Sequence, residues 1–152
     1  MDAQRVAFVA SRADTAQVAL AELEEMYGNV GVADADVIVA LGGDGFMLET
    51  LHRNMSRPLP IYGMNQGSVG FLMNIYKPEG LIDRIARADT NEIHPLRMHA
   101  IQRAGTTQEA IAINEASLHR QTGQASKVKI SIDGKERVPE VICDGVLVAT
   151  PA

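Results

Sequence analysis

The sequence predicts an α/β protein that begins with a parallel sheet and continues into a part built from strands alone. Three observations support this. Short apolar runs alternate with amphipathic helical patterns over roughly the first ninety residues. A glycine-rich turn, Gly42–Gly45, joins a wholly apolar run to one of those helical patterns. After about residue 91, polar and apolar residues alternate as they do in half-buried antiparallel strands.

The first part contains three strand–helix pairs in order. We expect strands at Arg5–Ala10, Asp36–Leu41 and Ile61–Met64, and helices at Asp14–Tyr27, Phe46–Arg53 and Glu79–Ala88. Gly28 ends the first helix, because glycine takes up the backbone conformation that follows a helix at no steric cost. Alternating strands and helices are typical of a parallel sheet with helices on both faces. We therefore assign residues 1–93 to a Rossmann-like α/β domain that binds a nucleotide or phosphate.

The second part, residues 94–152, begins an all-β, sandwich-like domain. The expected strands are His94–Arg103, Glu109–His119, Lys127–Ile132 and Val141–Ala149. Asp133-Gly134 is a strong hairpin signal after the third of them. The strands reach the last residues and leave edges that need a partner, so we expect the second domain to be incomplete, with its missing remainder outside these 152 residues.

The glycine turn is the stretch most suited to chemistry. Gly42-Gly43-Asp44-Gly45 follows a buried strand and opens a helix, so its backbone N–H groups and the positive helix end suit a phosphate. We expect its glycines to allow positive φ and to leave no Cβ in the way of a ligand. The alternative is a tight turn in which Asp44 only caps the helix. The turn matches neither a Walker P-loop nor the dinucleotide Gly-x-Gly-x-x-Gly fingerprint.

Composition excludes several classes of function. The net charge is −5 and there is no basic run, which argues against nucleic-acid binding. Cys143 is the only cysteine, which rules out an intrachain disulfide and favours a reducing compartment. No signal peptide or membrane-length apolar run is visible, so we expect a cytoplasmic protein without a membrane partner. The four histidines show no metal-ligand spacing with Cys143.

Four stretches, taken together, resemble the N-terminal portion of a bacterial NAD kinase. They are Gly42–Gly45, the second glycine-rich loop Asn65–Leu72, the pair Asn114-Glu115, and Asp144-Gly145 leading to Thr150-Pro151-Ala152. The first stretch alone also resembles the glycine turn of diacylglycerol kinases and sphingosine kinases, and similarly that of phosphofructokinases. The Asn-Glu pair and the second loop, at these spacings, make the resemblance specific to NAD kinase and extend it over nearly the whole chain.

The resemblance implies a reaction. Enzymes of this family transfer a phosphoryl group from ATP, or from polyphosphate in some members, to the 2′-hydroxyl of the adenosine ribose of NAD. Asp44 would accept the proton of that hydroxyl, with Gly45 beside it at the nucleotide. A divalent metal, Mg²⁺, would bridge the ATP phosphates. The resemblance also implies a homo-oligomer, a dimer or a tetramer.

The resemblance assigns five further residues to the NAD pocket. Asn114 and Glu115 would hold a ribose and base, because an amide beside a carboxylate offers donors and acceptors to vicinal hydroxyls. Phe71 would pack on the adenine ring, Asp144 would reach the nicotinamide end, often in the neighbouring subunit, and Ala152 would line the pocket. From the residues alone, an aromatic residue after a glycine-rich loop, such as Phe71, is more often a core residue. Likewise, one side chain of the Asn114-Glu115 pair could point to solvent from an alternating strand.

Two other functions stay open on the residues. A lipid kinase shares the glycine turn but needs an apolar acceptor groove, which Asn114-Glu115 does not favour. A non-catalytic nucleotide-binding module keeps the turn but needs no carboxylate at Asp44. We also expect these 152 residues alone to be inactive, because the segment that follows Ala152 in the family completes the pocket.

Overall fold

The computed structural model describes residues 5–57, 59–67 and 70–150, which form two compact units. The first unit spans Met1–Glu92 and the second Ile93–Ala152. The first contains a parallel sheet with helices, and the second contains antiparallel strands alone in its described part. The predicted fold class, a parallel α/β part followed by further β-strands, is therefore confirmed. No helix in the described ranges is long and apolar enough to span a membrane.

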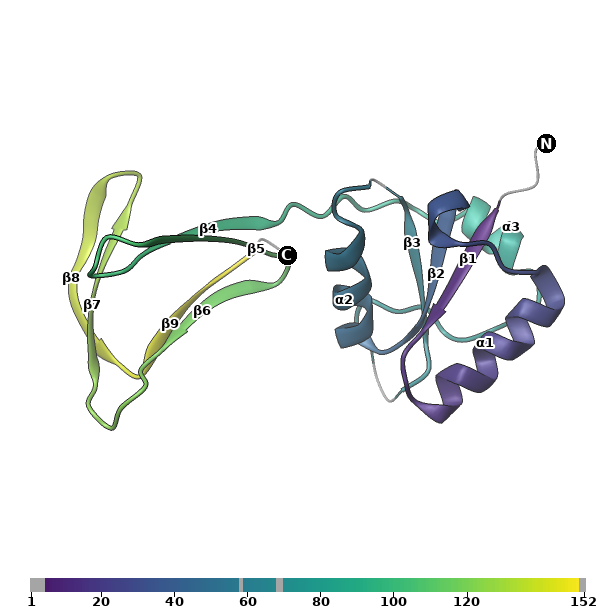
Figure 1. Cartoon of the computed structure of the whole chain (residues 1–152), viewed down its shortest axis with the longest axis horizontal. Coiled ribbons are helices and arrows are strands. Elements are labelled where there is room, and N and C mark those ends of the chain that lie inside the picture. The colour runs from purple at the N-terminus through teal and green to yellow at the C-terminus, as the bar shows by residue number, and fades with distance from the viewer. Residues whose placement is uncertain (1–4, 58, 68–69, 151–152) are drawn as a thin grey trace. The chain divides into compact units, whose positions relative to one another are not determined.

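The first unit is built on three parallel strands in the order β1-β2-β3. Its elements are β1 (Val6–Ala10), α1 (Asp14–Tyr27), the 3₁₀ turn η1 (Val32–Asp34), β2 (Val37–Gly42), α2 (Asp44–Asn54), β3 (Ile61–Asn65) and α3 (Leu81–Ala86). In Figure 1 the strands of this unit lie between α1 and α2. Because the strands are parallel, the chain leaves all three at the same edge, where α1, α2 and the second glycine-rich loop begin.

The core of this unit lies around β2, every residue of which is buried. On one face, Leu41 of β2 packs with Leu23 of α1, Met64 of β3 and Leu81 of α3. On the other face, Ile38 packs with residues of β1 and of the loops before β2 and β3. A strand buried on both faces has to be apolar throughout, and this is why its sequence is continuous rather than alternating.

Helix α1 begins and ends where the sequence predicts. Gly28 follows Tyr27 with φ 71°, and its N–H bonds the carbonyl of Glu24. Helix α2, by contrast, begins two residues before the predicted start, at Asp44 rather than Phe46. The difference matters because it places two residues of the glycine turn, Asp44 and Gly45, inside the first turn of the helix.

The second unit consists of three antiparallel strand pairs in its described part. The pairs are β4 (Leu96–Ile101) with β5 (Thr107–Ala112), β6 (Glu115–His119) with β9 (Gly145–Ala149), and β7 (Ser126–Ile132) with β8 (Lys135–Cys143). The predicted hairpin between β7 and β8 is confirmed. Its turn residues Asp133 and Gly134 both have positive φ, 52° and 72°, as a type I′ turn requires.

Two segments that are each predicted as one strand are divided between two strands in the structure. Glu109–His119 is interrupted by a bend at Ile113-Asn114, and Val141–Ala149 is interrupted at Asp144. The chain before Val141 is also a strand, although Pro139 lies within it. Proline cannot donate to a ladder, and the register of β7 with β8 shifts at this point, between the pairs Val128–Val141 and Ile130–Val138.

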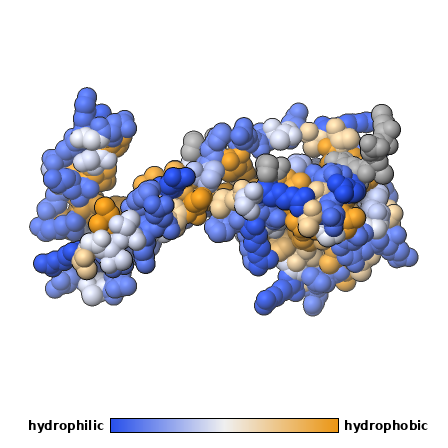
Figure 2. Space-filling model, turned by 45° about the horizontal axis from the view of Figure 1, so that its top comes forward, coloured by the Kyte–Doolittle hydropathy of each residue, from blue (hydrophilic) through white to orange (hydrophobic). Residues whose placement is uncertain are grey.

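The second unit has little hydrophobic core of its own. Ile113 is the one hydrophobic side chain that is buried among the described residues of this unit. Figure 2 shows apolar residues, in orange, at the surface among polar ones over its strands. The large exposed ones are Ile93, Ile101, Ile111, Leu118, Ile132, Ile142, Leu147 and Val148. The strands of this unit are thus held by their ladders more than by side-chain burial.

Candidate functional site

The glycine turn places a helix N-terminus at the carboxyl edge of the sheet. Strand β2 ends at Gly42, Gly43 is the residue before the helix, and α2 begins at Asp44. The first N–H groups of a helix have no acceptor within it, and the helix dipole adds partial positive charge there. An anion that approaches this edge of the sheet therefore meets donors and a favourable potential.

The glycines of the turn act through their size and not through unusual backbone angles. The positive φ that glycine allows is not used here: none of Gly42, Gly43 and Gly45 lies in the left-handed region, and Gly43 has φ −108°. A Cβ on Gly42 would lie 2.8 Å from Cβ of Phe46, so this position must be small for packing. A Cβ on Gly43 or Gly45 would meet no atom within 4 Å. These two positions leave open space in front of the helix.

Asp44 is not a helix cap, so the alternative interpretation of this residue is wrong. The capping position is Gly43, and no side chain caps α2. The carboxylate of Asp44 instead accepts two backbone hydrogen bonds from the second glycine-rich loop. The N–H of Phe71 bonds Oδ2 at 2.9 Å, and the N–H of Leu72 bonds Oδ1 at 3.0 Å. No motif or spacing in the sequence indicates this link between the two loops.

The second loop reaches Asp44 because the chain folds back along β3. The N–H of Asn65 bonds the carbonyl of Asn74 at 2.8 Å, and the N–H of Asn74 bonds the carbonyl of Gly63 at 2.9 Å. The N–H of Gln66 bonds the carbonyl of Gly42, which ties the start of this loop to the glycine turn. Ser68 and Val69 lie outside the described residues.

Phe71 is a surface residue. Its side chain is 93% exposed, so the alternative that it belongs to the core is wrong. Leu72 and Ile75, in the same returning segment, are also exposed. Apolar side chains that face solvent beside a helix N-terminus are available to a ligand.

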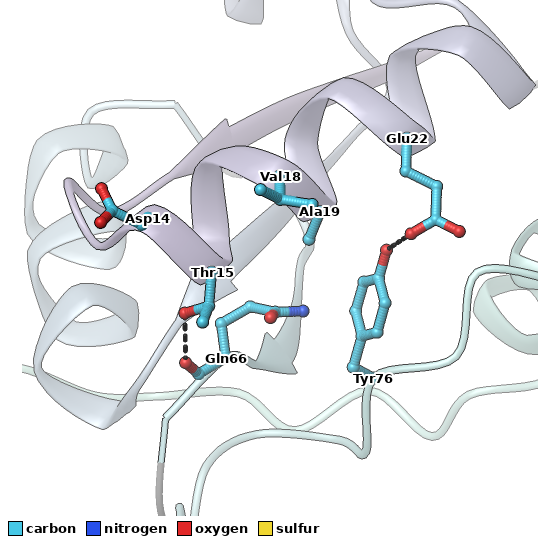
Figure 3. Close-up of a pocket in the computed structure, with 7 residues that line it drawn as sticks. All are labelled: Asp14, Thr15, Val18, Ala19, Glu22, Gln66 and Tyr76. Atoms are coloured by element: carbon cyan, nitrogen blue, oxygen red, sulfur yellow. Dashed lines mark hydrogen bonds between the residues drawn. The ribbon is translucent and has the colours of Figure 1, made fainter.

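A shallow pocket of about 350 Å³ lies beside this loop, between the start of α1 and the chain after β3. Figure 3 shows its lining, in which the hydroxyl of Thr15 donates to the carbonyl of Gln66 at 3.0 Å. The hydroxyl of Tyr76 donates to Glu22 at 2.6 Å. The pKa of Tyr76 is raised well above its usual value, mainly by burial and to a lesser extent by the hydrogen bond to Glu22. Asp44 does not line this pocket, whose lining residues come from α1 and from the chain after β3.

In the second unit, Asn114 and Glu115 lie side by side at a bend. The Nδ2 group of Asn114 donates to Oε2 of Glu115 at 3.0 Å, and both residues are exposed. Asn114 precedes β6 rather than lying inside a strand, so strand alternation does not separate the two side chains, and both are exposed. Thr150 holds the bend: its N–H bonds the carbonyl of Asn114 at 2.9 Å, and its hydroxyl bonds the carbonyl of Ile113 at 3.1 Å.

Asp144 lies at the other end of the same strand pair. Glu115 pairs with Ala149 at one end and His119 with Gly145 at the other. Asp144 lies one residue beyond Gly145, so five residues at roughly 3.4 Å each separate it from the level of Glu115, about 17 Å. Arg120 holds the Asp144 carboxylate through Nε at 2.7 Å, a partner that the sequence did not reveal. Ala152 lies outside the described residues.

The chain does not offer a metal cage built from protein ligands in its described part. No three His, Cys, Asp or Glu residues there lie close enough together to hold an ion. Asp44 is a single carboxylate, and its contacts with Phe71 and Leu72 use one lone pair on each oxygen. Mg²⁺ commonly binds to one or two carboxylates together with substrate phosphates and water, so the donor set fits a magnesium ion that arrives with a nucleotide.

Comparison with known families identifies the first unit. Residues 7–93 match the model of the ATP-NAD kinase N-terminal domain. The chain belongs to the ATP-NAD kinase family. The match contains the glycine turn, Asp44 and the second loop, which are the parts that the structure brings together.

Curated relatives extend the similarity over the second unit. The chain is 54% identical over its whole length to the NAD kinase of Cereibacter sphaeroides strain ATCC 17025, of which it covers 60%. It is 57% identical over 97% of its length to the NAD kinase of Caulobacter vibrioides, and 55% identical to that of Rhizobium meliloti. The chain thus spans about 57–60% of the length of these relatives.

A solved structure shows the same fold. The crystal structure of yeast NADH kinase complexed with NADH superposes with a TM-score of 0.79 and 20% sequence identity, over 97% of this chain and 57% of that one. At this level of identity the likeness concerns the fold.

Proposed function

We propose that this chain is the part of an NAD kinase that carries the proton acceptor of the reaction and a share of the NAD pocket. The observation that supports this most directly is the Asp44 carboxylate, which stands at an open helix N-terminus and is bound by the second loop. A nucleotide-binding module would need no carboxylate there. A lipid kinase is not favoured by the exposed amide–carboxylate pair Asn114-Glu115.

The reaction needs little covalent chemistry from the protein. The 2′-oxygen of the NAD ribose forms a bond to the γ-phosphorus of ATP, the bond from that phosphorus to the β–γ bridging oxygen breaks, and ADP leaves. The proton of the 2′-hydroxyl passes to the Asp44 carboxylate. The open positions Gly43 and Gly45 let phosphates approach the backbone N–H groups of α2. Polyphosphate could replace ATP as donor by the same chemistry.

Magnesium is the metal that this donor set suits. Bound to the phosphates and to Asp44, Mg²⁺ would offset the negative charge of the transferring group. Asp44 remains the only protein ligand that we assign to it.

The other pocket residues are assigned by family membership. Asn114 and Glu115 would hold a ribose and base of NAD, and Phe71, which is exposed and apolar, would pack on the adenine ring. Asp144 lies about 17 Å from Glu115 along the β6–β9 pair. That distance supports the proposal that it reaches the nicotinamide end of NAD in a neighbouring subunit of a homo-oligomer. Ala152 would line the pocket, and the enzyme would work in the cytoplasm.

The test is to replace Asp44 by Asn in the full gene product that contains this chain. We expect turnover to fall by roughly 10²–10⁴, the range for losing a general base, while NAD affinity stays within several-fold. Asp14→Asn is the matched control, since it removes the first-turn carboxylate of the other long helix, α1. Thermal unfolding of both variants checks that the fold is intact.

The assay follows NADP formation from NAD and ATP, with diacylglycerol as a competing acceptor. Near-normal turnover in Asp44→Asn would exclude this residue as the proton acceptor. Transfer to the lipid in preference to NAD would replace the proposed function by a lipid kinase. Activity of the 152 residues alone, at the level of the full gene product, would contradict the expectation that they are inactive by themselves.

A further inference from the structure

The contact between Asp44 and the second loop fixes the orientation of the carboxylate. An ionised carboxylate has about four lone-pair sites, two on each oxygen. The N–H groups of Phe71 and Leu72 take one site on each oxygen, at 2.9 and 3.0 Å. One site on each oxygen therefore stays available to a substrate hydroxyl. Two bonds to the backbone of the second loop hold the carboxylate plane in one orientation, as the third group of a catalytic triad holds its base.

Gly70 is the residue that makes this contact possible. A Cβ at Gly70 would lie 2.9 Å from Oδ1 of Asp44, with Cγ and Cβ of Met73 at 3.2 and 3.3 Å. The φ of Gly70 is outside the left-handed region, so its backbone conformation is open to any residue. Glycine is therefore required here for steric reasons: a Cβ would overlap with Oδ1 of Asp44.

We propose that Gly70 is a positioning residue that acts through Asp44: by lacking a Cβ, it lets the loop bind and orient the carboxylate that accepts the substrate proton. This inference rests on the proposed function, and it concerns a residue that sequence reasoning did not select. A methyl group at position 70 pushes the Asp44 carboxylate away from the N–H groups of Phe71 and Leu72 by a few tenths of an ångström. The backbone conformation and the open helix N-terminus stay as they are.

The first experiment compares Gly70→Ala with Gly31→Ala in the full gene product. Gly31 is a matched control, because a Cβ there would also face an aspartate oxygen, Oδ2 of Asp34, but at an ordinary 3.8 Å. A displacement of about 1 Å at a reacting group can cost about 10²-fold, so we expect Gly70→Ala to lower kcat by roughly tenfold. The KM for NAD should change by less than about twofold, because the proposed ribose-binding pair is in the other unit. Gly31→Ala should leave both constants unchanged.

The second experiment asks whether Gly70 acts through Asp44. In an Asp44→Asn background, Gly70→Ala should have no further effect on turnover, since the group that it positions is gone. A tenfold loss in both backgrounds, an unchanged kcat in the single variant, or an equal loss in Gly31→Ala would each overturn the proposal.

A third measurement does not depend on activity. Exchange of the Phe71 and Leu72 amide hydrogens with deuterium should be slow in the unmodified protein, because both amides are bonded to the Asp44 carboxylate, and faster in Gly70→Ala. Equal exchange rates in both proteins refute the positioning role of Gly70. If the full gene product makes no NADP but the exchange rates behave as expected, the proposed function fails while the contact itself stands.

Discussion

Replacing Gly45 by alanine should make the protein more stable and less active at the same time. Gly45 is the second residue of α2, its φ is outside the left-handed region, and a Cβ there meets no atom within 4 Å. The substitution therefore carries no steric cost in the free protein. Alanine is better than glycine in a helix by about 0.5–1 kcal/mol, chiefly because the unfolded chain has less freedom to lose. For a unit of this size, 1 kcal/mol corresponds to a shift in Tm of roughly 4–8 °C, so we expect a rise of about 2–8 °C.

The loss of activity has a separate cause. The space in front of Gly45 is where the nucleotide is proposed to approach the first turn of α2, and the new methyl group occupies that space. We expect kcat/KM for NAD to fall by about tenfold or more, which corresponds to about 1.4 kcal/mol of transition-state stabilisation. Stability and activity would then move in opposite directions at one position.

Thermal unfolding and the NADP-forming assay, run on the same preparations of the full gene product, measure the two effects. Gly42→Ala is the contrasting variant in the same turn. Its Cβ would lie 2.8 Å from Cβ of Phe46, so it should destabilise the protein by about 1–3 kcal/mol, as overpacking does. A Gly45→Ala protein with a raised Tm and unchanged kinetics would show that no ligand approaches this position.

Three further predictions test other parts of the chain. Glu115→Ala should weaken NAD binding by about 1–3 kcal/mol because a ligand hydroxyl loses its acceptor, and an unchanged Kd by calorimetry would remove this residue from the site. Leu23→Ala, at a fully buried position of α1, should lower the unfolding free energy by about 2–5 kcal/mol in urea, and a loss far below that range would mean that α1 packs loosely. Hydrogen bonds from Arg5 lower the pKa of Asp36, so this pair stabilises the fold fully above the ordinary aspartate pKa of about 4, and the contribution is lost as pH falls through the lowered pKa. Unfolding midpoints of the unmodified protein and Asp36→Asn should accordingly differ at neutral pH and converge as the solution is made acidic enough to protonate Asp36 in the folded protein, whereas a gap that does not change with pH would contradict the assignment.

Local patterns in the sequence determined most of the first unit. The continuous apolar run of β2 indicates burial on both faces, and Gly28 ends α1 because a residue with positive φ follows the helix. Asp133-Gly134 specifies its hairpin for the same reason. Each of these signals acts over a few neighbouring residues, where periodicity and backbone sterics decide the outcome. The breaks at Asn114 and Asp144 are not marked in the local pattern, because the residues that hold the chain there, Thr150 and Arg120, lie far from them in the sequence.

The sequence also determined that a carboxylate stands in a glycine turn at a helix start, but only the tertiary structure decided what holds it. The partners of Asp44 are the N–H groups of Phe71 and Leu72, 27 and 28 residues further along the chain. Every residue except proline carries a backbone N–H group, so the residue type does not indicate which of these groups binds Asp44. Only the return of the chain to lie beside β3 brings the two N–H groups within hydrogen-bonding distance of this carboxylate. The same return explains why Phe71 is exposed and why Gly70 has to be small. Side-chain chemistry can be read one residue at a time, whereas a backbone donor gains a role only when the fold places it opposite an acceptor.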